Sequence, residues 1–356
     1  MNLKKSFLLA VAAILTIAAC KKSSSVEPTS TNVYVAGFVQ SSIGTDVAVY
    51  WKNGVMIKLA DSLSNSIANA IAIHGNDIYI AGSLTPTGGN FELGYWKNGI
   101  FNSFENVGTL SNVNAITISN NNDVYVAGTI LGQNNRYVPT YWKNGMQHTL
   151  TDSSASSSGR LFGLALNGND VYAVGTVTSD ESNSSYAVYW KNDEPVYLLG
   201  GDSYATGIAL TDADIYVTGM FGENGSGNEE PVYWKNNVPT TLGSGTYFPS
   251  EVNAITSSGN DVYVAGAVFI RSSGITEATY WKNNVPVDIG SILNGITTSI
   301  AVSGNDVYTS GFSTPTSNLS PDPYYGDKAL YWKNNIPVKI DNATTAVALG
   351  IAVADQ

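Results

Sequence analysis

Short runs of alternating apolar and polar residues recur along most of the chain, and each run ends at residues that favour turns. One run is Val-Tyr-Val-Ala-Gly or a variant of it, in which the glycine always follows the tyrosine by three positions. A run rich in alanine, such as residues 69–73, precedes it. Alternation with a period of two residues predicts β-strands, and the Gly-Asn pairs between the two runs predict hairpin turns. The tyrosines of the Val-Tyr-Val-Ala-Gly runs are Tyr34, Tyr79, Tyr125, Tyr172, Tyr216, Tyr263 and Tyr308.

A third run ends in the quartet Tyr-Trp-Lys-Asn, which occurs seven times and contains every tryptophan of the chain. The next residue is Gly, Asn or Asp, and these residues tolerate the left-handed backbone of a hairpin turn. A fourth run follows, and Pro195, Pro239, Pro286 and Pro337 mark it as an edge strand because proline has no N–H to donate. The tryptophans are Trp51, Trp96, Trp142, Trp190, Trp234, Trp281 and Trp332, which are successively 45, 46, 48, 44, 47 and 51 residues apart.

Four antiparallel strands in each repeat of this length predict the blade of a β-propeller. The repeat region begins with a second strand at residues 32–37 and ends with an unpartnered first strand at residues 346–354. These two pieces would complete one blade, with three strands from the N-terminus and one from the C-terminus, and would remove two exposed sheet edges. We therefore predict an all-β fold over residues 32–356, a closed seven-bladed β-propeller of four-stranded antiparallel blades.

Residues 32–356 resemble, in broad terms, the bacterial β-propeller repeat lipoproteins, and the resemblance is carried by the YWKN-type repeats. The Gly-His and Trp-Asp signatures of WD40 repeats are missing, and no Gly-Gly pair recurs with the repeat as it would in kelch proteins. The resemblance implies a fold, and no specific function is carried over with it.

The residue pattern at the N-terminus is typical of a secretion leader. Lys4 and Lys5 precede an apolar run over residues 6–19 that is too short for a comfortable transmembrane helix. The run ends in Ile-Ala-Ala-Cys, which resembles a bacterial lipobox, so we expect a lipoprotein signal peptide at 1–19, a lipid on Cys20 and a flexible tether over 20–31. The alternative is an ordinary secretory leader with an incidental cysteine. Lys21 gives no inner-membrane retention signal, so we expect the protein at the outer membrane of the cell envelope.

Composition narrows the classes of partner. Charged residues are only 13% of the chain and the formal net charge is -11. Four of the 17 Lys and Arg residues lie in the first 22 positions and seven are the lysines of the quartets, so no basic patch is left for nucleic acid. Two histidines are too few for a histidine metal cage, and Cys20 is the only cysteine, so we expect no metal, no cofactor and no internal disulfide.

The repeats differ from one another on one side of the predicted ring. The turns between strands 1 and 2 and between strands 3 and 4 hardly vary, and they define a constant-turn face. The loops between strands 2 and 3 and between one blade and the next vary, and they define a variable-loop face, where we expect any binding site. The candidate ligand-binding residues on that face are Tyr324 and Tyr325 in a longer seventh loop, the acidic pair Glu229 and Glu230, and the aromatic pair Tyr247 and Phe248.

Each candidate also has a plain structural interpretation. The tyrosine loop could be a decorated rim loop, and the acidic pair could be a solvated surface. The recurring aspartates before the Val-Tyr pairs are explained together by a role in hairpin turns, so we do not interpret them as metal ligands. The tyrosine and tryptophan of each quartet should pack in the core between blades, since adjacent strand residues face opposite sides. His74 and His148 do not recur, and we interpret neither as a general base.

The sequence therefore favours a non-catalytic, surface-tethered binding or scaffold lipoprotein. We expect a monomer that engages a glycan or an envelope or extracellular protein through the variable-loop face. The alternative is a polysaccharide hydrolase or lyase that uses carboxylates on the same face, because such chemistry needs only two carboxylates at a suitable separation. Whether the protein is an enzyme is therefore left open, and the absence of serine-hydrolase, Walker A and zinc-protease motifs favours the binding role.

Overall fold

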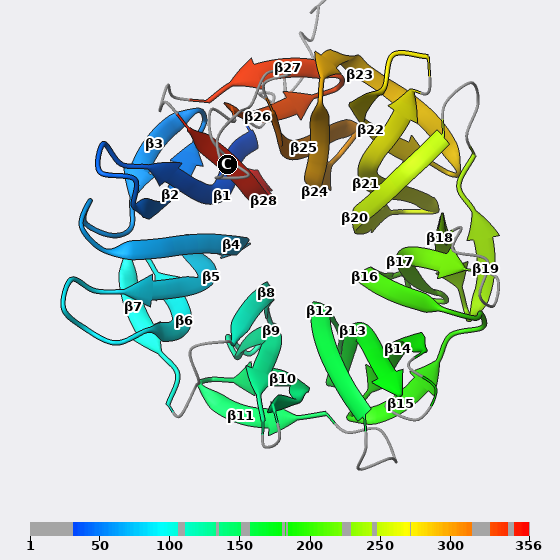
Figure 1. Cartoon of the computed structure of the whole chain (residues 1–356), viewed down its shortest axis with the longest axis horizontal. Coiled ribbons are helices and arrows are strands. Elements are labelled where there is room, and N and C mark those ends of the chain that lie inside the picture. The colour runs from blue at the N-terminus through cyan, green and yellow to red at the C-terminus, as the bar shows by residue number, and fades with distance from the viewer. Residues whose placement is uncertain are drawn as a thin grey trace, which may run out of the picture.

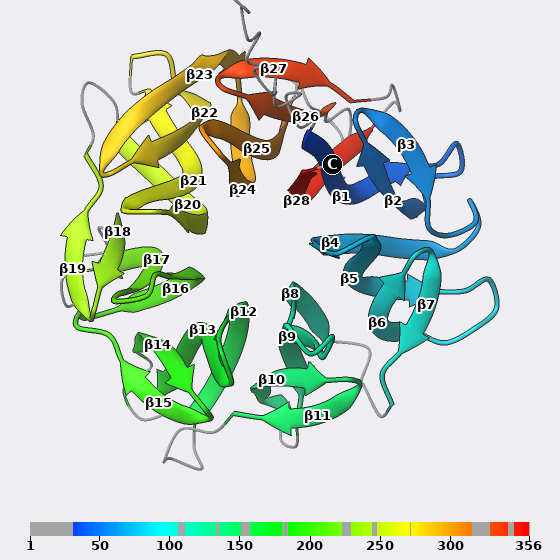
Figure 2. The same cartoon turned by 180° about the vertical axis from the view of Figure 1, so that it is seen from behind.

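The structure is a computed structural model that describes residues 31–105, 111–132, 135–150, 157–179, 182, 184–222, 229–243, 248–270, 272–314, 328–340 and 345–355. These residues form seven separate four-stranded sheets. The sheets are arranged as blades around a central opening, with the first strand of each blade innermost, as both views show (Figure 1, Figure 2). The predicted all-β, seven-bladed propeller of antiparallel blades is therefore confirmed.

The blades are numbered in chain order from the one that holds the N-terminal strand. Blade 1 consists of β28 (Ala346–Asp355), β1 (Thr31–Gln40), β2 (Asp46–Lys52) and β3 (Val55–Lys58). Blade 2 consists of β4 (Asn65–His74), β5 (Asp77–Thr85), β6 (Glu92–Lys97) and β7 (Ile100–Ser103). Blade 3 consists of β8 (Asn112–Ile118), β9 (Val124–Leu131), β10 (Tyr137–Lys143) and β11 (Met146–Thr149).

Blade 4 consists of β12 (Ser157–Asn167), β13 (Asp170–Ser179), β14 (Ser185–Lys191) and β15 (Glu194–Tyr197). Blade 5 consists of β16 (Ser203–Leu210), β17 (Ile215–Gly222), β18 (Glu229–Lys235) and β19 (Val238–Thr241). Blade 6 consists of β20 (Phe248–Ser258), β21 (Asp261–Ile270), β22 (Ile275–Lys282) and β23 (Val285–Leu293). Blade 7 consists of β24 (Gly295–Ser303), β25 (Asp306–Ser313), β26 (Lys328–Lys333) and β27 (Ile336–Lys339).

The two ends of the chain close the ring in blade 1. The C-terminal strand β28 pairs antiparallel with β1, so that Val33 lies opposite Val353 and Phe38 lies opposite Val347. Three strands of this blade come from the N-terminus and one from the C-terminus, as the sequence predicts. The prolines at 195, 239, 286 and 337 all lie in the outermost strands, where no further strand needs their missing N–H.

Every innermost strand carries a β-bulge, and the bulge explains the glycine of each Val-Tyr-Val-Ala-Gly run. The bulged residues are Asn69, Asn114, Phe162, Thr206, Asn253, Thr298 and Leu349. A bulge brings the backbone of the inner strand close to its neighbour. In blade 5, for example, a Cβ on Gly219 would collide with the carbonyl oxygen of Tyr204. The glycine therefore recurs because the inner strand leaves no room for a side chain.

The tryptophans fill the interfaces between blades. Each indole is at most 1% exposed, and it packs in a cluster with side chains of the preceding blade. Two indoles also donate a hydrogen bond to that blade, from Trp234 Nε1 to Leu199 O at 2.8 Å and from Trp281 Nε1 to Gly243 O at 2.9 Å. Removing such a side chain typically costs about 3–5 kcal/mol of stability. The prediction of core packing is confirmed for the tryptophans. Of the quartet tyrosines, Tyr141, Tyr280 and Tyr331 are buried, and the other four are half-buried against the same clusters.

In blades 2 to 7, the lysine and the asparagine of the quartet form a lock with an aspartate on the constant-turn face. In blade 6, Lys282 Nζ lies 2.8 Å from Asp261 Oδ2 and 5.2 Å from the centre of the Tyr263 ring. Asn283 Nδ2 donates to Asp261 Oδ1 at 2.7 Å, and Asn283 Oδ1 accepts from Val262 N at 2.9 Å. Blades 2 to 5 and blade 7 repeat these contacts. The lock joins the start of strand 2 to the end of strand 3, so the recurring aspartates serve the hairpins as predicted.

The turn that follows each lock requires left-handed backbone. The asparagine of the quartet has φ between 48° and 51°, and the next residue has φ between 69° and 84°. Two successive positive φ angles are the mark of the type I′ turn, which suits the twist of a β-hairpin.

Within the described residues, no helix combines the length and the apolar character that crossing a bilayer requires.

The lock predicts a loss of stability in acid. Hydrogen bonds from Lys282 and Asn283 lower the pKa of the Asp261 carboxyl. A carboxyl whose pKa is lower in the folded state contributes stability that is present above its unfolded pKa and is lost as the pH falls through the folded pKa. We expect Asp261→Asn to make the free energy of unfolding, measured by urea denaturation between about pH 2 and 6, fall less steeply in acid.

Blade 1 supplies a matched variant, because Asn32 takes the place of the aspartate there. Lys52 Nζ already lies 5.3 Å from the centre of the Tyr34 ring, and Asn53 Nδ2 donates to Asn32 Oδ1 at 2.8 Å. Asn32→Asp should therefore complete a seventh lock and make the acid dependence steeper than in the natural protein. The same pH profile in all three proteins would show that the lock carries no charge-dependent stability.

Candidate functional site

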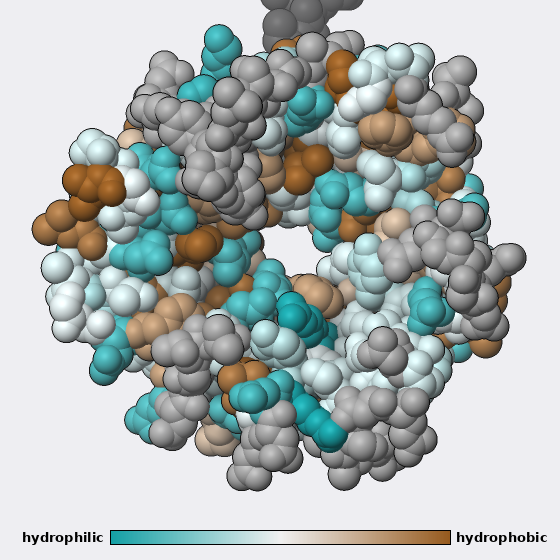
Figure 3. Space-filling view, viewed as in Figure 1, coloured by the Kyte–Doolittle hydropathy of each residue, from teal (hydrophilic) through white to brown (hydrophobic). Residues whose placement is uncertain are grey.

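The central channel forms one hollow in the described part of the chain. Its volume is about 280 Å³, and three successive residues from each innermost strand line it. The space-filling view shows that it is open from one side of the ring to the other (Figure 3). The bulged residues form one layer of this lining. Small residues form the next layer, and isoleucines with Leu164 form the third.

Most polar side chains in the bulged layer are used to join blades. Asn69 Nδ2 donates to Val113 O at 2.7 Å and Asn114 Nδ2 donates to Leu161 O at 2.7 Å, each in the following blade. Asn253 Nδ2 donates from blade 6 to Thr297 O of blade 7, and Thr298 Oγ1 donates from blade 7 to Ala348 O of blade 1, each at 2.9 Å. These donors have structural partners, so the channel wall itself offers a ligand few free polar groups.

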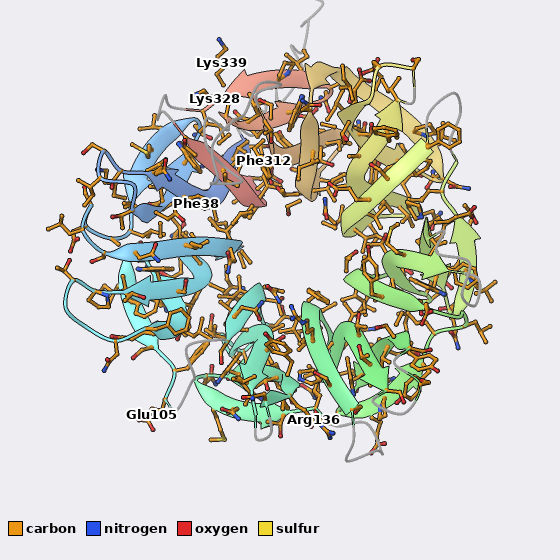
Figure 4. All side chains as sticks on the ribbon, viewed as in Figure 1. Phe38, Glu105, Arg136, Phe312, Lys328 and Lys339 are labelled. Atoms are coloured by element: carbon orange, nitrogen blue, oxygen red, sulfur yellow. The ribbon has the colours of Figure 1, made fainter. Side chains whose placement is uncertain are left out.

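The mouth of the channel on the variable-loop face is less regular. Seven equivalent residues lie two positions before the bulges, at the side where each innermost strand begins. In ring order they are Ile67, Asn112, Arg160, Tyr204, Glu251, Ile296 and Val347. Three of them join an apolar cluster with Phe38 and Phe312, which belong to blades 1 and 7 (Figure 4). The other four are polar and occupy blades 3 to 6, so the mouth has an apolar arc and a polar arc.

Glu251 is the carboxylate of the polar arc. Burial raises the pKa of its carboxyl. A hydrogen bond from Asn253 Nδ2 at 3.3 Å lowers this pKa, but by less than burial raises it. A raised carboxyl pKa is common at functional sites, although partial burial alone also produces it. Glu251 lines neither hollow, and we assign it no role.

The second hollow is a cavity of about 250 Å³ between blades 4 and 5 on the variable-loop face. Its lining residues are Ser158, Gly159, Arg160, Phe162, Thr176, Thr178, Ser185 and Tyr204. Phe162 also lines the channel, so the cavity adjoins the channel mouth. Four hydroxyl side chains, two aromatic rings and one guanidinium group thus meet in a space too small for a drug-sized molecule, which needs about 300–1,000 Å³.

Among the residues that line the cavity, Thr176 alone has a buried side-chain polar atom without a hydrogen-bond partner. Its side chain is 9% exposed, and its buried hydroxyl oxygen has no hydrogen-bond partner among the described residues. The equivalent residue of blade 3, Thr129, accepts a hydrogen bond from Leu161 N at 3.3 Å. A buried polar group without a partner costs free energy, so a ligand or an ordered water is expected to satisfy it.

Three further contacts shape the rim of the cavity. The Thr178 and Ser185 hydroxyls lie 3.0 Å apart, and Asp202 Oδ1 accepts a hydrogen bond from Ser185 N at 3.2 Å. The guanidinium carbon of Arg160 lies 4.2 Å from the centre of the Tyr137 ring in blade 3. This stacking uses the flat face of the guanidinium and leaves the N–H donors at its edge for a ligand. No described carboxylate forms an ion pair with Arg160.

The residues that the sequence singled out lie elsewhere or outside the described chain. Tyr324, Tyr325, Tyr247 and Cys20 lie outside the described residues, and so does the side chain of Glu229. Glu230 is exposed near the start of β18, opposite Phe221, and Phe248 is 46% exposed at the start of β20. Neither Glu230 nor Phe248 lines the cavity or the channel. Ligand binding at these six positions stays a prediction.

The histidines have structural surroundings. The ring of His148 stacks on that of Tyr141, with centroids 4.7 Å apart and planes 1° apart, and His74 ends β4 opposite Asp77. Within the described residues, no group of three or more His, Cys, Asp or Glu residues could hold a metal ion.

Sequence reasoning missed the cavity, although the sequence holds a signal for it. The residue that follows the repeat glycine is phenylalanine in blades 1 and 7, methionine in blade 5, serine in blade 2, alanine in blade 6 and threonine in blades 3 and 4. Phe38, Phe312 and Met220 fill the space beneath the next blade, whereas Thr176 leaves it open and polar. Because blade 3 also has a threonine at this position, the comparison indicates the interface between blades 4 and 5 only together with Tyr204, the one aromatic residue among the seven residues two positions before the bulges.

No protein family model matches the chain, and no curated protein matches its sequence. Among solved structures, the acylaminoacyl peptidase of Pyrococcus horikoshii is similar, with a TM-score of 0.53 at 12% identity over 88% of this chain and 50% of that one. A puromycin-hydrolyzing peptidase of Mycobacterium tuberculosis gives a TM-score of 0.52 at 8% identity, over 87% of this chain and 53% of that one. This chain spans about half the length of those peptidases. At such identities the likeness shows the propeller fold alone.

Proposed function

We propose that this protein is a non-catalytic binding protein of the bacterial cell envelope, held at the outer membrane by a lipid on Cys20. Its ligand is a glycan, one sugar unit of which enters the cavity between blades 4 and 5. The observation that carries the proposal is the unsatisfied, buried hydroxyl of Thr176 in a cavity lined by hydroxyl groups and aromatic rings.

The chemistry of the cavity suits a sugar. Each Ser or Thr hydroxyl can both donate and accept a hydrogen bond, as sugar hydroxyls do. Phe162 and Tyr204 offer aromatic rings whose apolar faces can cover the C–H face of a sugar ring, and the tyrosine adds a polar tip. Arg160 adds N–H donors at the rim. A peptide strand would instead need a free sheet edge, and each innermost strand, although its inward edge is unpaired, turns that edge into the channel.

The similar peptidases contribute to this proposal only through their architecture. In both, a chain about twice as long contains the region that resembles this propeller. The peptidase activity named for those proteins belongs to them, and none of the cavity residues described above depends on it.

The proposed tether predicts the location of the protein. Cys20→Ser removes the sulfur that would carry the lipid, and we expect it to move the protein from the membrane fraction of the producing bacterium to the soluble fraction. Lys21→Asp, which keeps Cys20, should leave the protein in a membrane fraction. Membrane association of the Cys20→Ser protein would show that the tether is not the lipid proposed here.

The proposed site predicts which variants lose binding. We expect the soluble protein to bind a glycan on a glycan array. Calorimetry with that glycan should then show about 2- to 10-fold weaker affinity for Thr176→Val. This variant loses one neutral hydrogen bond but keeps the shape of the side chain. Tyr204→Ala should weaken binding further because it removes an aromatic face. Tyr197→Ala changes a tyrosine that lies outside the cavity on the outermost strand of blade 4, and it should leave the affinity unchanged.

Three results would redirect the proposal. If no glycan binds on the array and the protein instead captures an envelope protein in a Tyr204-dependent way, a protein partner would be favoured. If the protein shortens a bound polysaccharide and Glu230→Gln abolishes that activity, the hydrolase or lyase would be favoured. Equal glycan affinity in the natural protein and in both cavity variants would place the binding site elsewhere.

A further inference from the structure

We infer that the constant-turn face rests against the membrane surface that carries the lipid anchor, and that the variable-loop face points away from it. This inference rests on the proposed anchor and adds an orientation to it. A lipid at the end of a flexible tether limits the distance of a protein from the bilayer, but it does not choose which face the protein presents.

The constant-turn face carries a ring of exposed apolar side chains. In six blades, the residue directly after the type I′ turn is large and apolar, and it is 61–72% exposed. These residues are Val55, Ile100, Met146, Val238, Val285 and Ile336. Scattered apolar residues are normal on a protein surface. Six at the same position of a ring-shaped repeat instead lie on one side of the molecule, where one flat partner can contact them together.

The fold does not require apolar residues at this position. In blade 4 the equivalent residue is Glu194, which begins β15 and pairs with Lys191 as its counterparts pair with the other quartet lysines. A position that accepts a charged residue in one blade is apolar in the other six, although water contacts most of each side chain. The preference therefore points to a partner outside the chain.

The chain enters the propeller on this same face. Strand β1 begins at Thr31, and Asn32 Oδ1 accepts a hydrogen bond from Asn53 Nδ2 in the turn that precedes Val55. The residues between Cys20 and Thr31 can span at most about 40 Å when fully extended. A lipid on Cys20 would thus hold the ring of apolar residues within reach of the bilayer, and the cavity between blades 4 and 5 would lie on the opposite face.

The charges of the face do not oppose such contact. Each apolar residue of the ring is the cross-strand partner of a quartet lysine, and five of these lysines are ion-paired with the aspartates of the locks. The paired charges largely cancel, so the net charge of -11 is not concentrated here. Lysine stems can lie along the apolar boundary while their amino groups stay with the lipid headgroups.

Fluorescent labels at two matched isoleucines test the orientation. Ile336 lies in the ring and is 68% exposed, whereas Ile43 is 65% exposed in the variable loop between β1 and β2. We replace each by cysteine, label it with an environment-sensitive dye, and place the lipidated protein on vesicles of phosphatidylethanolamine and phosphatidylglycerol. The Ile336→Cys label should shift to the blue and be quenched by lipids that carry a quencher in their acyl chains, and the Ile43→Cys label should do neither.

A second arm separates this inference from the proposed anchor. There a histidine tag replaces residues 1–20 and binds vesicles that contain a nickel-chelating lipid, so the result does not depend on a lipid at Cys20. A blue shift of the Ile336→Cys label in this arm supports the orientation even if Cys20 is never lipidated. No shift there, or an equal shift at Ile43→Cys, would overturn it. A shift that appears without vesicles and grows with protein concentration would also overturn it, since the ring would then join two copies of the chain.

Discussion

The burial of one tryptophan at every interface between blades is the interaction on which this structure depends. A four-stranded blade has two broad faces, and neither can be left in water. The indole covers one interface with the preceding blade, and the neighbouring tyrosines of the quartet and of strand 2 cover the interface with the next. An open ring would leave one such interface exposed to water, and the pairing of β28 with β1 closes the ring.

The repeated residues form the scaffold, and the unrepeated ones form the possible site. Trp, Lys, Asn and the strand-2 glycine each meet a requirement that recurs in every blade: a filled interface, a joined hairpin, a left-handed turn and room for a bulge. Where a blade departs from its neighbours, no such requirement explains the residue. Thr176 and Tyr204 meet in a polar cavity at one interface, whereas Phe38 and Ile67, at the equivalent positions, help to fill the interface between blades 1 and 2.

The fold could be predicted from the sequence because local patterns determine it. These patterns can be recognised from neighbouring residues in the chain or by comparing the repeats. They are the period of the strands, the turn residues, the prolines of the outer strands and the unpartnered strand at 346–354. The bulges were not predicted, although the invariant glycine is their consequence. The cavity was not predicted because its volume depends on pairs such as Thr176 and Tyr204, which meet only when two blades pack together. Glu230 and Phe248 became candidates because the sequence places them on variable loops. In the structure neither of them lines the cavity or the channel.

The central claim is that the scaffold and the binding site use separate sets of residues, and filling the cavity tests it most directly. The double variant Thr176→Phe with Tyr204→Ile copies the interface between blades 1 and 2 into the interface between blades 4 and 5. Its melting temperature and its affinity for the array-selected glycan are measured together. We expect a melting temperature equal to or above that of the natural protein and a loss of glycan binding. Unchanged binding in a folded double variant would contradict it.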